Sequence, residues 1–317
     1  MKKILVTGAC GQIGSELVPA LRQSFGGENV VAAGHQSPIP DDMKASGPFE
    51  YVDVTDFDQV DAAMRKHGVD TLFHLSSILS ALTEQLRPRA WTVNFDGVFN
   101  VLEAAVANGL ERVIVPSSIA AFGPGTPLDN TPNDTVQKPN TLYGISKVFT
   151  ELMGNYYSSK LGLEVRGVRL PGIVSWKVEP TAGTTDYAVA IFYGAIRENR
   201  YTCFLGPDSR LPMMYMPDAI AALTDVATAD GERLTHHSDF NVNAMSFTPA
   251  ELAEAIRKRL PGFEIDYEVD PLRQSIADSW PDKLDDTVAR KEWDWEPHYD
   301  LDEMVDDMLE NLGRKLG

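Results

Sequence analysis

Cysteine is scarce in this chain of 317 residues, which contains only Cys10 and Cys203. Two cysteines are too few for a disulfide framework or for a cysteine-rich zinc site. Long apolar runs are also missing, since no stretch approaches the roughly 18 apolar residues that a membrane helix needs. The apolar run at 4–6 is far too short for the core of a secretory signal. We therefore expect a cytoplasmic protein with no membrane partner.

Basic side chains are in deficit. The sequence has 28 lysines and arginines against 46 aspartates and glutamates, which gives a formal net charge of -18. A surface with this excess of negative charge repels nucleic acids and anionic membranes. We therefore expect neither as a partner. With 43% hydrophobic residues, the chain can still bury a large core.

The first half alternates short apolar strands with amphipathic helices, which predicts a parallel sheet with helices on both faces. Thr55 stands where the cap of one helix belongs, and 37–48 reads as a loop. Beyond residue 172 the alternation weakens, which indicates a smaller lobe whose chain returns in places to the main sheet. The predicted strands are 3–7, 30–33, 51–54, 71–75, 112–117 and 164–170, and the predicted helices are 14–23, 57–67, 91–108, 143–161, 186–199, 217–228, 249–259 and 301–312.

A glycine-rich segment, Gly8-Ala-Cys-Gly-Gln-Ile-Gly14, lies between the first predicted strand and the first helix. Its glycines allow a tight turn and close approach to a pyrophosphate, which the N–H groups of the helix N-terminus stabilise. Strand, turn and helix together predict dinucleotide binding by Gly8, Gly11, Gln12, Ile13 and Gly14. The fold class is therefore α/β, a Rossmann-type doubly wound sheet over residues 1–172 with a mainly substrate-binding lobe over 173–317.

The choice between NAD and NADP rests on the end of the second strand, which reads VAAGHQ over 31–36. It offers neither an acid for the ribose hydroxyls nor an arginine for a 2′-phosphate. We expect NAD, and NADP is not excluded. Asp53, after the third strand, either receives the adenine amino group or caps the helix that begins near Thr55.

Tyr143 and Lys147 form the most informative pair in the sequence. Four residues apart on a predicted helix, they share one face. An ammonium beside a phenol favours the phenolate and thus a proton acceptor. Ser118 stands upstream at the end of a predicted strand, where parallel sheets build their sites, and its hydroxyl can hold a substrate oxygen.

In order and approximate spacing, these motifs and the segment 169–172 (RLPG) resemble the extended short-chain dehydrogenase/reductase family. The resemblance implies that Tyr143 is the general acid/base, that Ser118 is the catalytic hydroxyl and that Lys147 binds the nicotinamide ribose. It further implies that the segment after Pro171 contacts the nicotinamide carboxamide. Other cofactor contacts implied by the resemblance are Val54, Leu75 and Ser76.

Second-half strings at 171–176, 183–188, 213–218 and 279–281 resemble the short-chain-type L-threonine 3-dehydrogenases. The resemblance implies oxidation of the 3-hydroxyl of L-threonine to 2-amino-3-oxobutyrate, with hydride passed to NAD and Tyr143 as the base. It also implies substrate contacts by Ser80, Thr184 and Thr185 beside Ser118 and Tyr143. For Ser80 and Thr184, simple loop capping is the alternative.

Two other functions stay open at this point. A nucleotide-sugar 4-epimerase or dehydratase of the same family would offer basic side chains to a diphosphate. Four basic residues between 176 and 211 leave that alternative standing, namely Lys177, Arg197, Arg200 and Arg210. A non-catalytic dinucleotide sensor would have no need of Ser118, Tyr143 and Lys147.

Three further expectations concern assembly and packing. Relatives in the family pair through two long helices, which here are 91–108 and 143–161, so we expect a homodimer. His74, within an apolar strand, is expected to be a hydrogen-bonded structural residue. Trp293, Trp295 and the methionines of 213–216 are expected to pack in the core.

Overall fold

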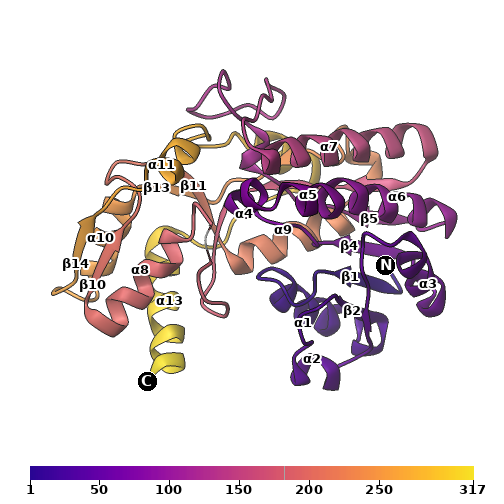
Figure 1. Cartoon of the computed structure of the whole chain (residues 1–317), viewed down its shortest axis with the longest axis horizontal. Helices are drawn as coiled ribbons and strands as arrows, with labels where there is room; N and C mark the ends of the chain where they lie inside the picture. Colours follow the sequence, from indigo (N-terminus) through magenta and orange to yellow (C-terminus); the bar gives the residue numbers. More distant parts are fainter. Residues whose placement is uncertain (182) are drawn as a thin grey trace.

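A computed structural model describes residues 1–181 and 183–317, and its centre is a six-stranded parallel sheet (Figure 1). The strand order β3-β2-β1-β4-β5-β7 is that of a Rossmann sheet, which confirms the predicted fold class. The order reverses between β1 and β4, and ligands bind beside such a switch point. The strands are β1 (Ile4–Thr7), β2 (Val30–Gly34), β3 (Phe49–Tyr51), β4 (Thr71–His74), β5 (Arg112–Ile114) and β7 (Glu164–Arg166).

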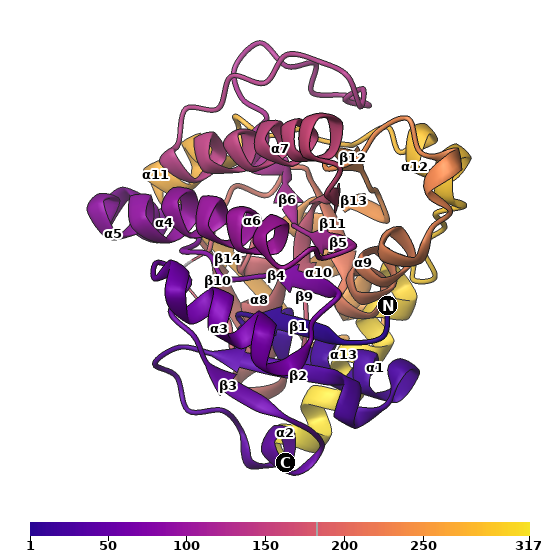
Figure 2. The same ribbon diagram turned by 90° about the vertical axis from the view of Figure 1, so that its right-hand side faces the viewer.

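Helices cover both faces of this sheet because alternate strand residues point to opposite sides. Ile4 and Val6 pack against α1 (Gly14–Phe25) and α9 (Met216–Thr228). Leu5, between them, packs with the layer that contains α3 (Phe57–His67), α6 (Gly97–Ala107) and α7 (Leu142–Leu161). Figure 2 shows the sheet between these two helical layers.

The boundaries of α3 show how local chemistry sets an element. Asp56, not Thr55, is its N-cap, with the carboxylate accepting from the backbone N–H groups of Asp58 and Gln59. Thr55 instead donates from its backbone and hydroxyl to Asp53. Gly68 ends the helix in the left-handed conformation at φ 58°.

Two strands predicted as continuous are in fact divided between sheets. The segment 112–117 forms β5 and then joins β6 (Ser117–Ser118), while 164–170 forms β7 and then β8 (Val168–Leu170). At the break, the backbone N–H of Gly167 donates to the carbonyl oxygen of His237. A Cβ on Gly167 would lie 2.4 Å from the carbonyl oxygen of Val115. The chain thus moves into a second sheet, ordered β12-β8-β6, with β12 at Phe240–Asn241.

Several other expectations need correction. The strand predicted at 51–54 is β3 at Phe49–Tyr51, and the predicted loop 37–48 contains a short helix, α2 (Asp41–Ala45). The helix predicted at 91–108 begins earlier and is interrupted, running as α5 (Arg87–Trp91), a π-helical turn η2 (Thr92–Asp96) and α6. The sequence also missed the short helix α4 (Ser80–Gln85).

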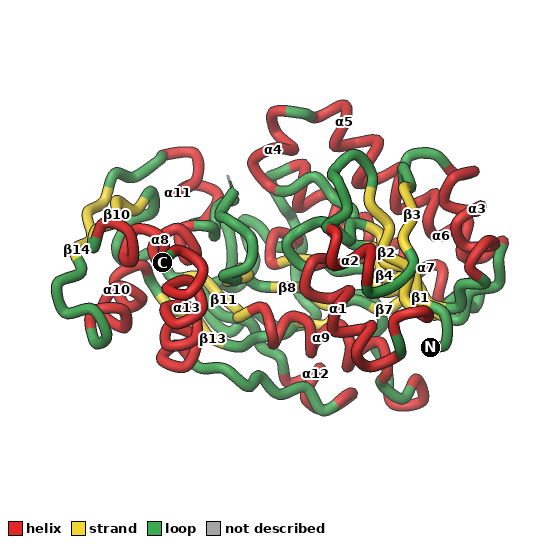
Figure 3. Tube along the Cα trace, turned by 90° about the horizontal axis from the view of Figure 1, so that it is seen from below, coloured by secondary structure: helices red, strands yellow, loops and turns green. Residues whose placement is uncertain are grey.

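The second half builds a lobe with its own apolar core beside the main sheet (Figure 3). The predicted helices of this half are confirmed as α8 (Tyr187–Glu198), α9, α10 (Pro249–Arg257) and α13 (Leu301–Leu316). The other elements of this half are β9 (Gly172–Val174), β10 (Arg200–Cys203), β11 (Leu211–Tyr215), β13 (Met245–Phe247), β14 (Glu264–Tyr267), α11 (Pro271–Ala277) and α12 (Thr287–Trp293), of which α12 packs against the main sheet.

The expected packing residues of this half are buried. Trp293 and Trp295 lie in the core between the sheet and α9, and Met213 to Met216 are fully enclosed. Within residues 1–181 and 183–317, no helix combines the length and apolarity needed to cross a membrane.

Leu72→Ala tests the core of the central sheet. Leu72 is 0% exposed in β4, so truncation leaves a cavity and we expect a loss of about 2–5 kcal/mol in the free energy of unfolding. The same change at Leu272, which is 59% exposed on α11, should cost under about 0.5 kcal/mol. Urea unfolding followed by circular dichroism measures both, and equal losses would contradict this assignment of the core.

Candidate active site

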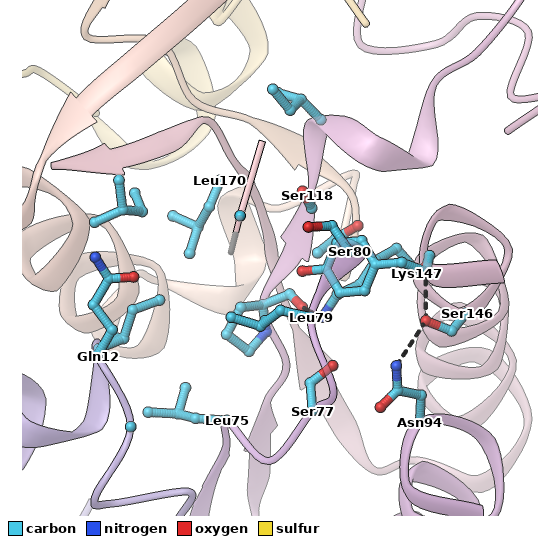
Figure 4. A pocket seen from close by; sticks show the side chains of 18 of the residues that line it. Gln12, Leu75, Ser77, Leu79, Ser80, Asn94, Ser118, Ser146, Lys147 and Leu170 are labelled. Atoms are coloured by element: carbon cyan, nitrogen blue, oxygen red, sulfur yellow. Dashed lines mark hydrogen bonds between the residues drawn. The ribbon is translucent and has the colours of Figure 1, made fainter. Parts of the chain in front are cut away.

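A pocket lies where the carboxyl ends of the central strands face the lobe (Figure 4). Figure 4 shows Gln12 and Leu75 on one side of it and Ser118, Ser80 and Lys147 on the other. Fourteen of the residues expected from the sequence line this one pocket: Gly8, Gly11, Gln12, Ile13, Gly14, Leu75, Ser76, Ser80, Ser118, Tyr143, Lys147, Pro171, Thr184 and Thr185.

The glycine loop fits a dinucleotide pyrophosphate. A Cβ on Gly14 would lie 2.3 Å from the carbonyl oxygen of Gly8, and one on Gly8 would lie 2.9 Å from the backbone of Leu75 and Ser76. Gly8 also has φ 69°, which favours glycine. In the described structure no side chain caps the N-terminus of α1, and Ile13 and Gly14 at this end of the helix line the pocket, so its partial positive charge is available to an anion there.

Asp53 and Val54 stand apart from this lining. Asp53 accepts from Thr55 and lies 3.2 Å from His35 Nε2, at the end of β2. Burial raises the pKa of Asp53, but the hydrogen bonds from Thr55 and the nearby His35 outweigh it and hold the pKa below its ordinary value. Val54 is buried and its carbonyl oxygen accepts from Asn100. Cofactor contact by either residue stays a prediction.

Close packing of α7 places Tyr143 beside Ser118. Thr141 caps the helix by accepting from the N–H of Gly144 at 3.1 Å. A Cβ on Gly144 would lie 2.2 Å from the carbonyl oxygen of Ala120, so glycine allows α7 to approach the turn after Ser118. The hydroxyl of Ser118 in turn accepts from the N–H of Ala120.

Lys147 lies one helical turn beyond Tyr143, as the spacing predicted. Its ammonium donates to the carbonyl oxygen of Pro116 at 2.9 Å and lies 5.3 Å from the centre of the Tyr143 ring. Burial raises the pKa of Tyr143 to about 12, partly opposed by the Ser118 hydroxyl. Burial also lowers the pKa of Lys147 to about 8, against the opposing charge of Glu151. The pocket therefore disfavours both charged forms before a ligand enters.

Asn94 is a pocket residue that sequence reasoning missed. It lies in the π-helical turn η2, where its amide accepts from the N–H of Ile78 at 2.8 Å and donates to the carbonyl oxygen of Ile78 at 2.9 Å. The same amide lies 3.5 Å from the hydroxyl of Ser146 on α7 (Figure 4). Such π-turns often mark functional positions, but no local sequence signal reveals one.

His74 is buried at the end of β4, with Nδ1 2.9 Å from the hydroxyl of Thr7. This contact agrees with the expected structural role. His74 lines the pocket, and its Nε2 has no hydrogen-bond partner among the described residues. Burial, followed by the charge of Lys147, lowers the pKa of His74 to about 3, so the ring is neutral.

The lobe contributes Thr184, whose hydroxyl is buried and without a hydrogen-bond partner among the described residues. A buried polar group without a partner is costly, which indicates that a ligand completes this one. Thr185 and Ser80 line the same pocket. Trp280 also lines it, although the sequence analysis noted this residue only within the segment 279–281 and predicted no site role for it.

The four basic residues that made a diphosphate-containing substrate an alternative are each paired with a carboxylate. Their partners are Glu16 for Lys177, Glu179 for Arg197, Asp266 for Arg200 and Glu251 for Arg210. Among the described residues that line the pocket, Lys147 is the only lysine and none is arginine. The pocket therefore suits a small polar substrate better than a second diphosphate.

Comparison with solved structures confirms the resemblance across the whole chain. An L-threonine dehydrogenase of Clostridium difficile is 48% identical, with a TM-score of 0.97 and coverage of 99% of this chain and 98% of that one. A monomeric L-threonine 3-dehydrogenase from a metagenome is 39% identical, with a TM-score of 0.94 and coverage of 99% and 100%.

Sequence comparison agrees with this result. An uncharacterised epimerase/dehydratase of Staphylococcus haemolyticus is 45% identical over 315 residues, or 99% of each chain. The sequence profile described as the NAD dependent epimerase/dehydratase family matches residues 4–242. The chain belongs to the NAD-dependent epimerase/dehydratase family, among the extended short-chain dehydrogenases/reductases.

Proposed function

We propose that the chain is an NAD-dependent L-threonine 3-dehydrogenase. One observation carries the proposal: Ser118, Tyr143 and Lys147 share a pocket with Thr184, a buried lobe hydroxyl that lacks a partner among the described residues. The described lining of that pocket includes the glycine loop for one dinucleotide. Lys147 is its only basic side chain other than His74, so it lacks the lysines and arginines that would bind the diphosphate of a nucleotide-sugar substrate. The likeness to L-threonine dehydrogenases, at up to 48% identity over nearly the full length, supports the substrate.

In this proposal residues 1–172 hold the dinucleotide and residues 173–317 mainly hold the substrate. The glycine loop and the N-terminus of α1 receive the pyrophosphate, while Leu75, Ser76 and Pro171 line the path toward Tyr143. When bound, the nicotinamide ring supplies the acceptor for the hydride that leaves C3 of threonine. The end of β2 offers neither an acid to the ribose hydroxyls nor an arginine to a 2′-phosphate, so the proposal of NAD rests on the family profile, which describes NAD-dependent enzymes.

Tyr143 accepts the proton of the substrate 3-hydroxyl, and Ser118 holds the oxygen from which that proton leaves. Because burial raises the pKa of Tyr143, the phenolate needs the Lys147 ammonium nearby. The carbonyl oxygen of Pro116 keeps that ammonium at the edge of the pocket. Loss of the proton and of the hydride leaves the 3-oxo product, 2-amino-3-oxobutyrate.

The amino acid end of the substrate needs donors and acceptors, which Thr184, Thr185 and Ser80 provide. Thr184 comes from the lobe and Ser80 from α4 beside the sheet, so a bound substrate joins the two parts of the molecule. Its binding excludes water from the oxygen held by Ser118.

A nucleotide-sugar 4-epimerase or dehydratase is the second candidate, because the family profile and the curated relatives carry that description. Such an enzyme returns the hydride to its substrate and shows no net reduction of the cofactor. The described pocket lining includes none of Lys177, Arg197, Arg200 and Arg210, which argues against it.

The protein forms a homodimer in this proposal, through the outer face of α6 and α7. An apolar groove there is lined mainly by large side chains, and patches of this kind mark protein interfaces. Leu152, Trp91 and Phe99 are among its most exposed members. A second copy brings an identical face, as a two-fold interface requires. The residues are Trp91, Phe95, Asp96, Phe99, Pro139, Ile145, Val148, Phe149, Leu152 and Met153.

Purified protein should reduce NAD when L-threonine is added, which absorbance of the reduced nicotinamide measures directly. The same assay with NADP should be slower.

Tyr143→Phe removes the proton acceptor, so we expect turnover to fall by about 10²-fold or more while NAD affinity stays within about twofold. Absence of reduction with both cofactors would reject the threonine dehydrogenase and favour the epimerase. Full turnover in Tyr143→Phe would remove the tyrosine from the mechanism.

Thr184→Val tests the substrate contact. It removes a hydroxyl without changing the shape of the side chain, so we expect KM for L-threonine to rise about tenfold, equivalent to about 1.4 kcal/mol, with little change in NAD affinity. Thr184→Ser retains the hydroxyl and should stay close to the parent. If both variants keep the parent KM, Thr184 is a loop residue only.

Leu152→Glu tests the homodimer. Leu152 is 62% exposed in the apolar groove, and a charge buried there without a partner opposes pairing. We expect light scattering to give the mass of two chains for the parent and of one chain for the variant. Leu272→Glu, on the exposed face of α11, is the control and should leave the mass unchanged. A single-chain mass for the parent at micromolar concentration would end the proposal.

A further inference from the structure

Glu151 of α7 and Arg169 of β8 form a buried ion pair next to the Tyr143 and Lys147 site. Glu151 follows Lys147 by one helical turn, so Tyr143, Lys147 and Glu151 share one side of the helix. Arg169 of β8 donates from Nε and Nη2 to the two carboxylate oxygens of Glu151, both at 2.9 Å. Glu151 is 2% exposed and Arg169 is 3% exposed.

Every oxygen of this carboxylate has a second partner as well. Ser117, the neighbour of Ser118, donates its hydroxyl to Oε1, and Gln137 donates its side-chain amide to Oε2 at 2.6 Å. Arg169 donates further to the carbonyl oxygen of Asn133 at 2.7 Å and to the side chain of Asn241 at 3.1 Å. The pair thus joins α7, β6, β8, β12 and the loop before α7.

A buried ion pair of this kind needs an explanation beyond stability. Desolvation of two charges offsets most of their attraction, so an apolar pair of the same volume is often equally stable. Arg169 also lies over the ring of Phe122, 5.0 Å from its centre, immediately after the Ser118 turn. Ser117 is the contact of this pair that lines the pocket, and Glu151 is the member of the pair that lies on α7 with Lys147.

We propose that Glu151 is a positioning residue that keeps the Lys147 ammonium charged, and that Arg169 holds Glu151 in place for this role. The inference deepens the proposed function, since it rests on Lys147 serving the dinucleotide and Tyr143. Glu151 acts through Lys147 and through Ser117, which both line the pocket, while Glu151 is itself not among the described lining residues.

The charges around Lys147 support this assignment. Lys147 is faced by Tyr143 and Glu151 of its own helix and by His74 of β4, while Arg169 of β8 is paired with Glu151. Asp186 of the lobe lines the same pocket. Burial lowers the pKa of Lys147 to about 8, and the charge of Glu151 is what opposes that fall. His74 is neutral, because its pKa is lowered to about 3.

The sign of the pH effect follows from this arrangement. Lys147 is charged below its pKa and neutral above it, so a function that needs the ammonium is lost as the pH rises through about 8. Removing the carboxylate lowers the Lys147 pKa further and moves that loss to lower pH. The uncompensated charge of Arg169 acts in the same direction.

The test measures NADH affinity from pH 6 to pH 10 by nucleotide fluorescence, with no threonine present. The parent should bind less tightly above about pH 8, and Lys147→Met should lack this step. In Glu151→Gln we expect the midpoint about one pH unit lower. The alkaline limb of kcat/KM should move with it. Glu151→Gln leaves the charge of Arg169 without a partner. The double variant Glu151→Gln with Arg169→Gln removes both charges of the ion pair. Its midpoint should also lie below that of the parent, but the fall should be smaller than in Glu151→Gln alone.

Glu164→Gln is the matched control. Glu164 accepts from Arg166 and Arg112 at the opposite end of the sheet, and Arg166 is as buried as Arg169. This variant should lower the melting temperature and leave the NADH midpoint unchanged. An unchanged midpoint in both Glu151 variants, with only a lower melting temperature, would overturn the proposal and leave a structural ion pair. Failure of the parent to oxidise threonine, with the NADH midpoints as expected, would reject the proposed substrate alone.

Discussion

Burial of the Lys147 ammonium beside the Tyr143 ring is the constraint on which the rest of the site depends. A charge removed from water is stable only where the protein replaces its hydration. Here the carbonyl oxygen of Pro116 provides the direct contact and Glu151 provides the opposite charge. The position of α7, the break after β5 and the buried partner Arg169 are all required to keep these groups in place.

The same constraint explains why the sheet divides where it does. Ser117 and Arg169 both lie just beyond the ends of β5 and β7, in β6 and β8, and both donate to Glu151. The break at Gly167 transfers the chain to the second sheet, where β6 and β8 pair and bring Ser118 and Arg169 to the face of α7. A small backbone irregularity thus produces the polar end of the pocket.

Among the described lining residues, the lobe adds one carboxylate and no lysine or arginine to the pocket. Lys177, Arg197, Arg200 and Arg210 are paired with carboxylates, and the polar groups that the lobe contributes to the lining include the hydroxyls of Thr184 and Thr185 and the carboxylate of Asp186. A pocket of this composition distinguishes a small amino acid from a ligand with a second diphosphate. The proposed substrate therefore rests on two features of the described lining. It contains hydroxyls that can bind an amino acid, and it contains no arginine and no lysine other than Lys147.

The sequence by itself determined the Rossmann sheet, the glycine loop and the pairing of Tyr143 with Lys147 on one face of a helix, because these depend on local turns and on spacing along that helix. Local pattern also sufficed for the long lobe helices. It could not decide the division of strands 112–117 and 164–170, the π-turn that positions Asn94, or the ion pair of Glu151 with Arg169. Those features arise between segments far apart in the chain, where tertiary packing and desolvation outweigh local preference.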